Sequence, residues 1–250
     1  MTNCKKNKIL EISIPTETRT SILEKIFKYI EKPNDFFHIV SLNPENLVVA
    51  TENDLFKRVI ETAQIKIIDG IGVVLAGRLF NLNLKRLTGV DLMKELIKVA
   101  SNRRLRVLMI GGKENLADEL VECYARKFPE AKFKGMQGIK NIKNSNHDEE
   151  TNIFSIVAAY KPQLVFVAFG SPDQELWIER HRNEFSSCIT MGVGGSFDYL
   201  SNNVKRAPVL IQKVGLEWLY RLVTQPWRWK RQLRLVKFIW LIIRQKWNKS

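Results

Sequence analysis

Two polar residues end apolar runs at points where a side chain could reach a substrate. Asp69 follows Lys66-Ile67-Ile68, and Asn43 follows Ser41-Leu42 and precedes Pro44. A carboxylate at the end of a buried strand can act as a general base, and it can equally cap the helix that follows. Asparagine before proline is likewise a good N-cap. Position alone therefore allows a functional and a structural role for both residues.

Glycine follows four apolar runs, directly or one residue later. The four places are Asp69-Gly70, Gly111-Gly112, Gly170-Ser171 and Gly192-Val193-Gly194-Gly195. The carboxyl ends of parallel strands form the ligand crevice of an open sheet, and glycine lets backbone N–H groups approach phosphate oxygens. One such glycine is ordinary turn chemistry, but four at one edge favour a nucleotide crevice. The G-x-G-x-x-G and Walker A patterns are absent, which disfavours NAD enzymes and P-loop NTPases.

The elements that must position these residues alternate between short apolar runs and helical patterns. We expect strands at 36–42, 65–68, 106–110, 164–169 and 188–193, and helices at 21–30, 45–61, 90–102, 115–127, 148–160 and 172–183. This alternation predicts an α/β, Rossmann-like fold with a mostly parallel sheet and helices on both faces. Residues 9–14 alternate like a strand, and the polar segment 135–146 is expected to be a loop. Gln174 falls in the first turn of the helix expected at 172–183, which follows the strand at 164–169, and is expected at the edge of the crevice.

The composition limits the function classes. The chain has 250 residues, 45% of them hydrophobic, with 40 Lys and Arg against 26 Asp and Glu, a formal net charge of +14. A collagen-like or disordered chain is excluded, and an anionic partner is expected: nucleic acid, an acidic membrane face or a phosphorylated substrate. Three widely spaced cysteines favour a reducing cytosol over a disulfide framework or a zinc site. Neither a signal peptide nor an apolar run of the ~20 residues needed to span a bilayer is expected.

The C-terminal segment carries most of the charge excess. Residues 218–250 contain nine Lys and Arg, no Asp or Glu, and five of the six tryptophans. We therefore divide the chain into an α/β core, 1–217, and a basic, tryptophan-rich, amphipathic helical appendage, 218–250. Indole rings at the interface and cations on lipid phosphates suit an anionic leaflet. The alternative is a docked C-terminal helix with a solvated basic face; we favour the membrane because tryptophan enrichment at interfaces is a physical preference.

Several short sequence motifs, called words below, follow one another along the chain. They are Ser41-Leu42-Asn43-Pro44-Glu45, Asp69-Gly70-Ile71-Gly72, Arg86-Leu87-Thr88-Gly89-Val90-Asp91, Gly170-Ser171-Pro172-Asp173-Gln174-Glu175, Gly192-Val193-Gly194-Gly195-Ser196-Phe197-Asp198, Arg206-Ala207-Pro208 and Gly215-Leu216-Glu217-Trp218-Leu219-Tyr220-Arg221. With these words the chain resembles the WecG/TagA/CpsF glycosyltransferase family, glycosyltransferase family 26. The words containing Gln174, Arg206 and Glu217 make the resemblance highly specific.

The resemblance implies an activity and a set of site residues. Members of this family are inverting enzymes that move a sugar, often N-acetylmannosamine, from UDP to a diphospho-undecaprenyl-linked sugar in the synthesis of cell-envelope polysaccharide or teichoic acid. By resemblance, Asp69 is the base that deprotonates the acceptor hydroxyl. The remaining implied substrate-binding residues are Ser41, Asn43, Arg86, Gln174 and Arg206, with Arg221, Arg228 and Arg231 closing over the nucleotide diphosphate. The enzyme is then expected in the cytoplasm, peripherally on the inner face of the cell membrane, as a monomer or homo-oligomer.

The residues also indicate how a departing diphosphate would be stabilised. Sugar-nucleotide enzymes use either a divalent cation held by carboxylates or fixed positive groups. No D-x-D triplet occurs in the chain. Arginine is permanently charged and binds phosphate oxygens bidentately. We therefore expect a transferase that needs no metal and no other cofactor.

Two other classes compete with this interpretation. A basic nucleic-acid-binding α/β protein would explain the tail, with arginines on phosphates and tryptophans stacked on bases. It would leave Asp69 and the glycine-ended strands unexplained, so we expect no nucleic acid partner. A metal-free transferase for another activated donor, such as a methyltransferase, would use a similar sheet and would respond to its own cofactor instead of UDP.

Overall fold

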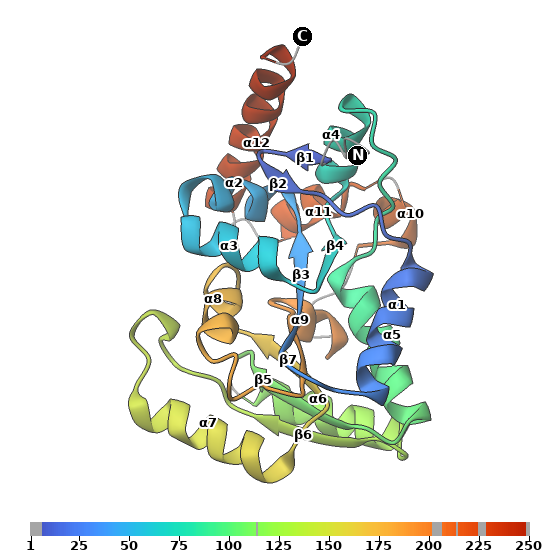
Figure 1. Ribbon diagram of the computed structural model, residues 1–250, viewed down its shortest axis with the longest axis vertical. Helices are drawn as coiled ribbons and strands as arrows, with labels where there is room; N and C mark the ends of the chain where they lie inside the picture. Colours follow the sequence, from blue (N-terminus) through green and yellow to red (C-terminus); the bar gives the residue numbers. More distant parts are fainter. Residues whose placement is uncertain (1–6, 114, 202–206, 214, 225–228, 249–250) are drawn as a thin grey trace.

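A computed structural model describes residues 7–113, 115–201, 207–213, 215–224 and 229–248 (Figure 1). Six strands form one parallel sheet in the order β4-β3-β8-β7-β5-β6. Their bounds are β3 Phe37–Leu42, β4 Ile65–Ile68, β5 Arg106–Gly111, β6 Lys132–Met136, β7 Leu164–Ala168 and β8 Ile189–Gly192. The α/β fold with a parallel sheet, predicted from the alternation of elements, is confirmed. A separate antiparallel hairpin joins β1, Lys8–Ile9, to β2, Ile12–Ser13.

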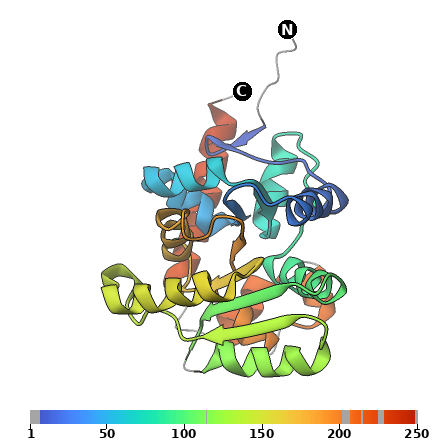
Figure 2. The same cartoon turned by 60° about the horizontal axis from the view of Figure 1, so that its bottom comes forward.

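Helices cover both faces of the sheet. Their bounds are α1 Arg19–Glu31, α2 Pro44–Glu52, α3 Asp54–Thr62, α4 Ile71–Leu79, α5 Gly89–Asn102, α6 Leu116–Lys127, α7 His147–Tyr160, α8 Asp173–Arg180, α9 Ser196–Leu200, α10 Val209–Lys213, α11 Glu217–Thr224 and α12 Trp229–Trp247. One apolar cluster joins α1, α5, α6 and α9 to one face. On the other face, one cluster includes α2, α3, α4 and α12, and another includes α7 and α8. Figure 2 shows α6 and α7 on opposite sides of the sheet.

The inner strands of the sheet are mostly apolar because both of their faces are buried. On β7, Leu164 and Phe166 face the first cluster, while Val165 and Val167 face a second one. The same two-residue alternation holds on β5 and β3. Continuous apolar runs are typical of parallel strands covered on both faces. Because all six strands run in the same direction, their carboxyl ends meet along one edge.

The last helix is packed on the core. Phe238 and Ile242 of α12 are buried in the cluster formed by α2, α3 and α4. Arg234 pairs with Glu45 of α2 at 2.7 Å, and Lys237 pairs with Glu52. No helix in the described part of the chain is long and apolar enough to span a bilayer. The division into residues 1–217 and 218–250 stays a prediction, although α12 shares a core with the first part.

Several expected elements differ from the observed ones. The helix expected at 45–61 is two helices, because Asn53 caps α3: its side chain accepts from the Phe56 N–H at 2.9 Å. The expected loop at 135–146 begins inside β6, an edge strand whose lysines and glycine concealed it. Helix α4 was not expected, since its sequence is apolar on all sides and contains two glycines. The five strands expected in the parallel sheet are all present.

Candidate active site

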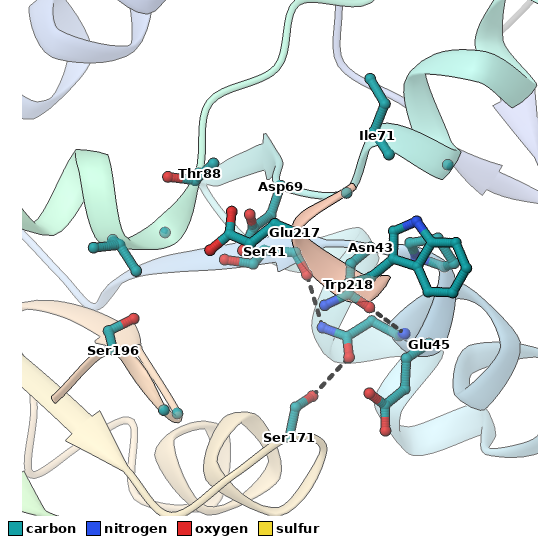
Figure 3. Close-up of a pocket in the computed structure, with 18 of the residues that line it drawn as sticks. Ser41, Asn43, Glu45, Asp69, Ile71, Thr88, Ser171, Ser196, Glu217 and Trp218 are labelled. Atoms are coloured by element: carbon teal, nitrogen blue, oxygen red, sulfur yellow. Dashed lines mark hydrogen bonds between the residues drawn. The ribbon is translucent and has the colours of Figure 1, made fainter. Parts of the chain in front are cut away.

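A cavity of about 760 Å³ lies at the carboxyl edge of the sheet (Figure 3). Glycines that follow β4, β5 and β7, together with those at the end of β8, line it, as expected from the glycine-ended runs. They are Gly70, Gly112, Gly170, Gly192, Gly194 and Gly195. Five of the predicted site residues also line this cavity: Ser41, Asn43, Asp69, Arg86 and Gln174. The structure therefore brings together side chains that lie up to 133 positions apart in the sequence.

Asp69 comes directly after β4 and is partly buried. Its backbone N–H donates to the Leu42 carbonyl at 2.9 Å, which fixes the strand end beside β3. Figure 3 shows Asp69, Ser41 and Glu217 close together among the residues that line the cavity. A Cβ on Gly89 would lie 3.3 Å from the Ser41 hydroxyl and 3.6 Å from a carboxylate oxygen of Asp69, so only a small residue fits there without displacing neighbours. The N-cap of α4 is Gly70 and not Asp69, so Asp69 does not cap that helix, and its role as a general base stays a prediction.

Asn43 combines a cap with a place on the cavity wall. Its side-chain oxygen accepts from the Asn46 N–H at 2.8 Å, so the capping alternative is confirmed, and Asn43 also lines the cavity. Asn46 is buried behind it and joins two strand ends. The Asn46 amide donates to the Ser41 carbonyl at 2.8 Å, and its oxygen accepts from the Ser171 hydroxyl at 2.9 Å. Sequence reasoning did not single out Asn46, because it resembles any residue in the first turn of a helix.

Arg86 lines the cavity with its guanidinium engaged by the protein. Its Nε donates to the Asp69 carbonyl at 2.8 Å, and one terminal nitrogen donates to the Gln212 carbonyl at 3.0 Å. The other lies 3.4 Å from a Glu217 carboxylate oxygen. These three contacts join the end of β4 to the segment that leads into α11. They also place Arg86 beside Asp69 in the cavity, and its contact with substrate stays a prediction.

Gln174 is buried and ties two loops together. Its side-chain oxygen accepts from the backbone N–H groups of Gly170 and Gly194, at 3.1 and 3.0 Å. Its amide nitrogen donates to Glu175 at 2.7 Å. Burial raises the pKa of the Glu175 carboxyl above its ordinary value, which favours the neutral form. Gln174 thus holds the loops after β7 and β8 at a fixed separation across the cavity.

The predicted arginines of the tail are only partly described. Arg206 and Arg228 lie outside the described residues. Arg221 belongs to α11 and Arg231 to α12, but the structure does not describe their side chains. Their contact with a diphosphate stays a prediction. The tail does reach the cavity, since Trp218 lines it near Asn43 (Figure 3), as do Phe238 and Ile239 of α12.

Glu217 is the functional candidate that sequence reasoning missed. It is buried, opens α11 and faces Arg86 in the cavity that holds Asp69. The sequence feature that could have identified it is the motif Gly215–Arg221, which contains Glu217. Gly215, two residues before Glu217, lies where the chain passes close to α4. It has a φ of +79°, and an added Cβ would lie 2.5 Å from the Ile71 side chain. The chain can therefore pass close to α4 only with glycine at this position.

The donor set of the cavity is carboxylate, amide and hydroxyl oxygen. Within the described residues, no group of three or more His, Cys, Asp or Glu side chains is placed to hold a metal ion. Several backbone N–H groups of the glycine-rich loops are engaged by the protein. Those of Gly70 and Gly112 donate to the carbonyls of Leu42 and Ala168, and those of Gly170 and Gly194 donate to the Gln174 side chain.

Comparisons with known proteins identify the family to which the chain belongs. The profile of the glycosyl transferase WecG/TagA/CpsF family matches residues 7–250. The chain is similar to N-acetylglucosaminyldiphosphoundecaprenol N-acetyl-beta-D-mannosaminyltransferases from three bacteria. These come from Bacillus subtilis strain 168 (35% identity; 85% of this chain, 81% of the relative), Bacillus spizizenii strain W23 (34%; 87% and 82%) and Staphylococcus aureus strain NCTC 8325 (31%; 93% and 89%). With a profile match over nearly its whole length and relatives of this identity, the chain belongs to the WecG/TagA/CpsF family of glycosyl transferases.

Proposed function

We propose that this glycosyltransferase moves N-acetylmannosamine from UDP to N-acetylglucosaminyl diphospho-undecaprenol, with inversion at the anomeric carbon. The observation that carries the proposal is the Asp69 carboxylate at the end of β4, held beside Ser41 and Glu217 in the large cavity. The relatives named above support the choice of sugar and acceptor, because both are part of their names. The family assignment favours this reaction over nucleic acid binding or methyl transfer.

The chemistry assigned to Asp69 is general-base catalysis. The acceptor hydroxyl oxygen forms a bond to the anomeric carbon while the bond from that carbon to the UDP oxygen breaks. The hydroxyl proton passes to the Asp69 carboxylate, and UDP leaves with the electron pair of the broken bond. Attack on the face opposite the leaving group inverts the configuration. A positioned carboxylate contributes about 10²–10⁴-fold to such a step.

The negative charge that develops on UDP needs fixed positive groups or N–H donors. The N–H groups of Gly170 and Gly194, in the loops after β7 and β8, already donate to the Gln174 side chain, so the charge on UDP falls to cationic side chains. We assign Arg206, Arg221, Arg228 and Arg231 to the diphosphate, since arginine binds phosphate bidentately and the tail approaches the cavity. With these cations in place the reaction needs no divalent metal.

The outer surface of the tail supports a peripheral membrane location. Trp229, Trp240 and Trp247 of α12 are exposed although α12 packs on α2. An exposed apolar surface of this kind marks a docking site, and the surrounding Lys and Arg would favour an anionic leaflet. Contact with the leaflet would bring the enzyme to an acceptor that is itself anchored in lipid.

A donor panel tests this function. UDP-sugars are incubated with the protein and N-acetylglucosaminyl diphospho-undecaprenol in detergent, with and without excess EDTA, and product mass is recorded. We expect the mass of one N-acetylhexosamine to be added from UDP-N-acetylmannosamine under both conditions. Loss of transfer in EDTA, restored by Mg²⁺ or Mn²⁺, would contradict the arginine assignment. A melting temperature raised by an oligonucleotide and not by UDP would contradict the function itself.

A further inference from the structure

The cavity that contains Asp69 has an apolar end as well as a polar one. The polar end is formed by Asp69, Ser41, Asn43 and the glycine-rich loops. At the apolar end, α4 and α12 line the same cavity with aliphatic side chains. We call these six residues the apolar arm: Leu75, Leu79, Leu235, Ile239, Ile242 and Ile243.

Helical spacing explains why the two helices meet as an apolar surface. Leu75 and Leu79 are four positions apart, so they share one face of α4. On α12, Leu235, Ile239 and Ile242 recur at intervals of four and three positions and share one face of that helix. The helices approach closely, since a Cβ on Gly72 of α4 would lie 3.7 Å from the Phe238 ring of α12. The apolar arm is thus a built wall of the cavity.

Most of the apolar arm is uncovered by the described part of the chain. Leu75 and Leu79 are each 51% exposed, and Ile239 and Ile243 are 51% and 56% exposed. Exposing large aliphatic groups to water is unfavourable, so a surface of this kind marks a binding site for an apolar partner. Continuity with the polar end restricts that partner to a molecule with both a polar and a hydrocarbon part.

We infer that the apolar arm binds the first isoprene units of the acceptor's polyprenyl chain while its diphospho-sugar lies at the polar end. The inference rests on the proposed function, which supplies an acceptor with these two parts. A bilayer lipid or a second copy of this chain could cover an apolar face, but neither needs a polar end beside a catalytic carboxylate. The acceptor is one molecule that fills both ends of the cavity.

Chain-length dependence of transfer tests the inference in the full-length protein. Two detergent-dispersed acceptors are compared: N-acetylglucosaminyl diphospho-undecaprenol, and the same head group on a short, water-soluble alkyl chain that ends before the apolar arm. The variants are Ile239→Asn and Leu75→Asn, one from each helix. The matched control is Val236→Asn, because Val236 is 66% exposed on the same α12 and does not line the cavity. Ile239→Asn and Val236→Asn each remove one exposed aliphatic group from α12, so they weaken general adhesion to lipid or micelles alike.

The expected result is a selective loss. Ile239→Asn and Leu75→Asn should lower kcat/KM for the undecaprenyl acceptor by about 5- to 10-fold, as expected when part of an aliphatic contact is lost, and leave the short acceptor unchanged. Val236→Asn should leave both values unchanged. Equal losses in Ile239→Asn and Val236→Asn would assign the surface to the bilayer or to a second copy, and no loss in either would remove the role in chain binding. Absence of transfer to both acceptors by the unsubstituted protein would instead refute the proposed function and the inference with it.

Discussion

The Arg86 guanidinium donates through Nε to the backbone carbonyl of Asp69, at 2.8 Å. The same side chain contacts Glu217 at 3.4 Å, although the two residues are 131 positions apart. One arginine therefore joins the strand end that carries the proposed base to the first residue of α11. Arg86 lies between Glu217 and the backbone of Asp69 and contacts both.

The contact between Arg86 and Glu217 predicts energetic coupling. Arg86→Gln and Glu217→Gln should each lower the free energy of unfolding by about 1–3 kcal/mol, because each leaves a largely buried charged partner with fewer hydrogen bonds. The double variant should lose less than the sum of the two, with a coupling of at least about 0.5 kcal/mol. Urea unfolding of the four proteins measures this, and strict additivity would mean that the ion pair adds nothing to stability.

The buried pair Gln174 and Glu175 predicts a different response at two nearby glycines. A Cβ on Gly192 would lie 2.6 Å from the Gln174 amide nitrogen and 2.8 Å from a Glu175 oxygen. Gly192→Ala should therefore lower the free energy of unfolding by about 1–3 kcal/mol and reduce transfer, since the loops held by Gln174 must shift. The control is Gly195→Ala, where the nearest atom outside its chain neighbours is 3.7 Å away and the backbone φ is −74°. Similar midpoints in urea for the two variants would disprove the packing argument.

Much of this arrangement could be predicted from the sequence, because local patterns determine it. Continuous apolar runs identified five of the six strands of the parallel sheet, since strands covered on both faces are apolar throughout. The glycines after those runs located the cavity. Strand β6 was missed because an edge strand is covered on fewer sides and tolerates Lys132, Lys134 and Gly135.

The remaining features depend on contacts between distant segments. No local pattern shows that Arg86 meets Glu217, or that Asn46 connects Ser41 to Ser171. The apolar faces of α4 and α12 are separated by about 160 positions in the chain, and only the fold places them on one cavity. The roles assigned to the tail arginines stay predictions, since the structure does not describe their side chains.

A buried histidine predicts a pH dependence of stability. His38 on β3 is 1% exposed, neither ring nitrogen has a hydrogen-bond partner among the described residues, and burial lowers its pKa to about 3 from an ordinary value of 6.5. As the pH falls, His38 is protonated in the unfolded state before it is protonated in the folded state. The contribution of neutral His38 to the free energy of unfolding is therefore complete above pH 6.5. It is lost as the pH falls from 6.5 toward 3, by up to about 1.4 kcal/mol per pH unit.

The matched comparison is His38→Leu, which has a similar volume and no titrating group. The free energy of unfolding of the two proteins is measured by urea titration between pH 7 and pH 4, a range chosen to bracket the first part of the transition. The difference between them should shift in favour of His38→Leu as the pH falls. A difference that does not change with pH would mean that His38 is not buried in its neutral form.

The tail arginines predict a loss of transfer that is separable from membrane binding. Replacing Arg221, Arg228 and Arg231 by glutamine should lower kcat/KM by about 10²-fold or more on a detergent-dispersed acceptor, because the charge on the departing UDP is no longer offset. The control replaces Arg244, Lys246 and Lys249, which removes the same charge from the same tail. Both triple variants should bind anionic liposomes more weakly than the unsubstituted protein and to a similar extent. Normal turnover in the first variant would restrict the tail to anchoring.

The central claim is that Asp69 removes the proton from the acceptor hydroxyl, and Asp69→Asn tests it most directly. The measurement is the rate of N-acetylmannosamine transfer from its UDP donor to the short acceptor, together with the dissociation constant of UDP for both proteins. The substitution keeps the size of the side chain and removes its basicity. We predict a kcat about 10²–10⁴-fold lower with UDP affinity nearly unchanged. A near-normal kcat in Asp69→Asn would contradict the account and leave this carboxylate a structural role.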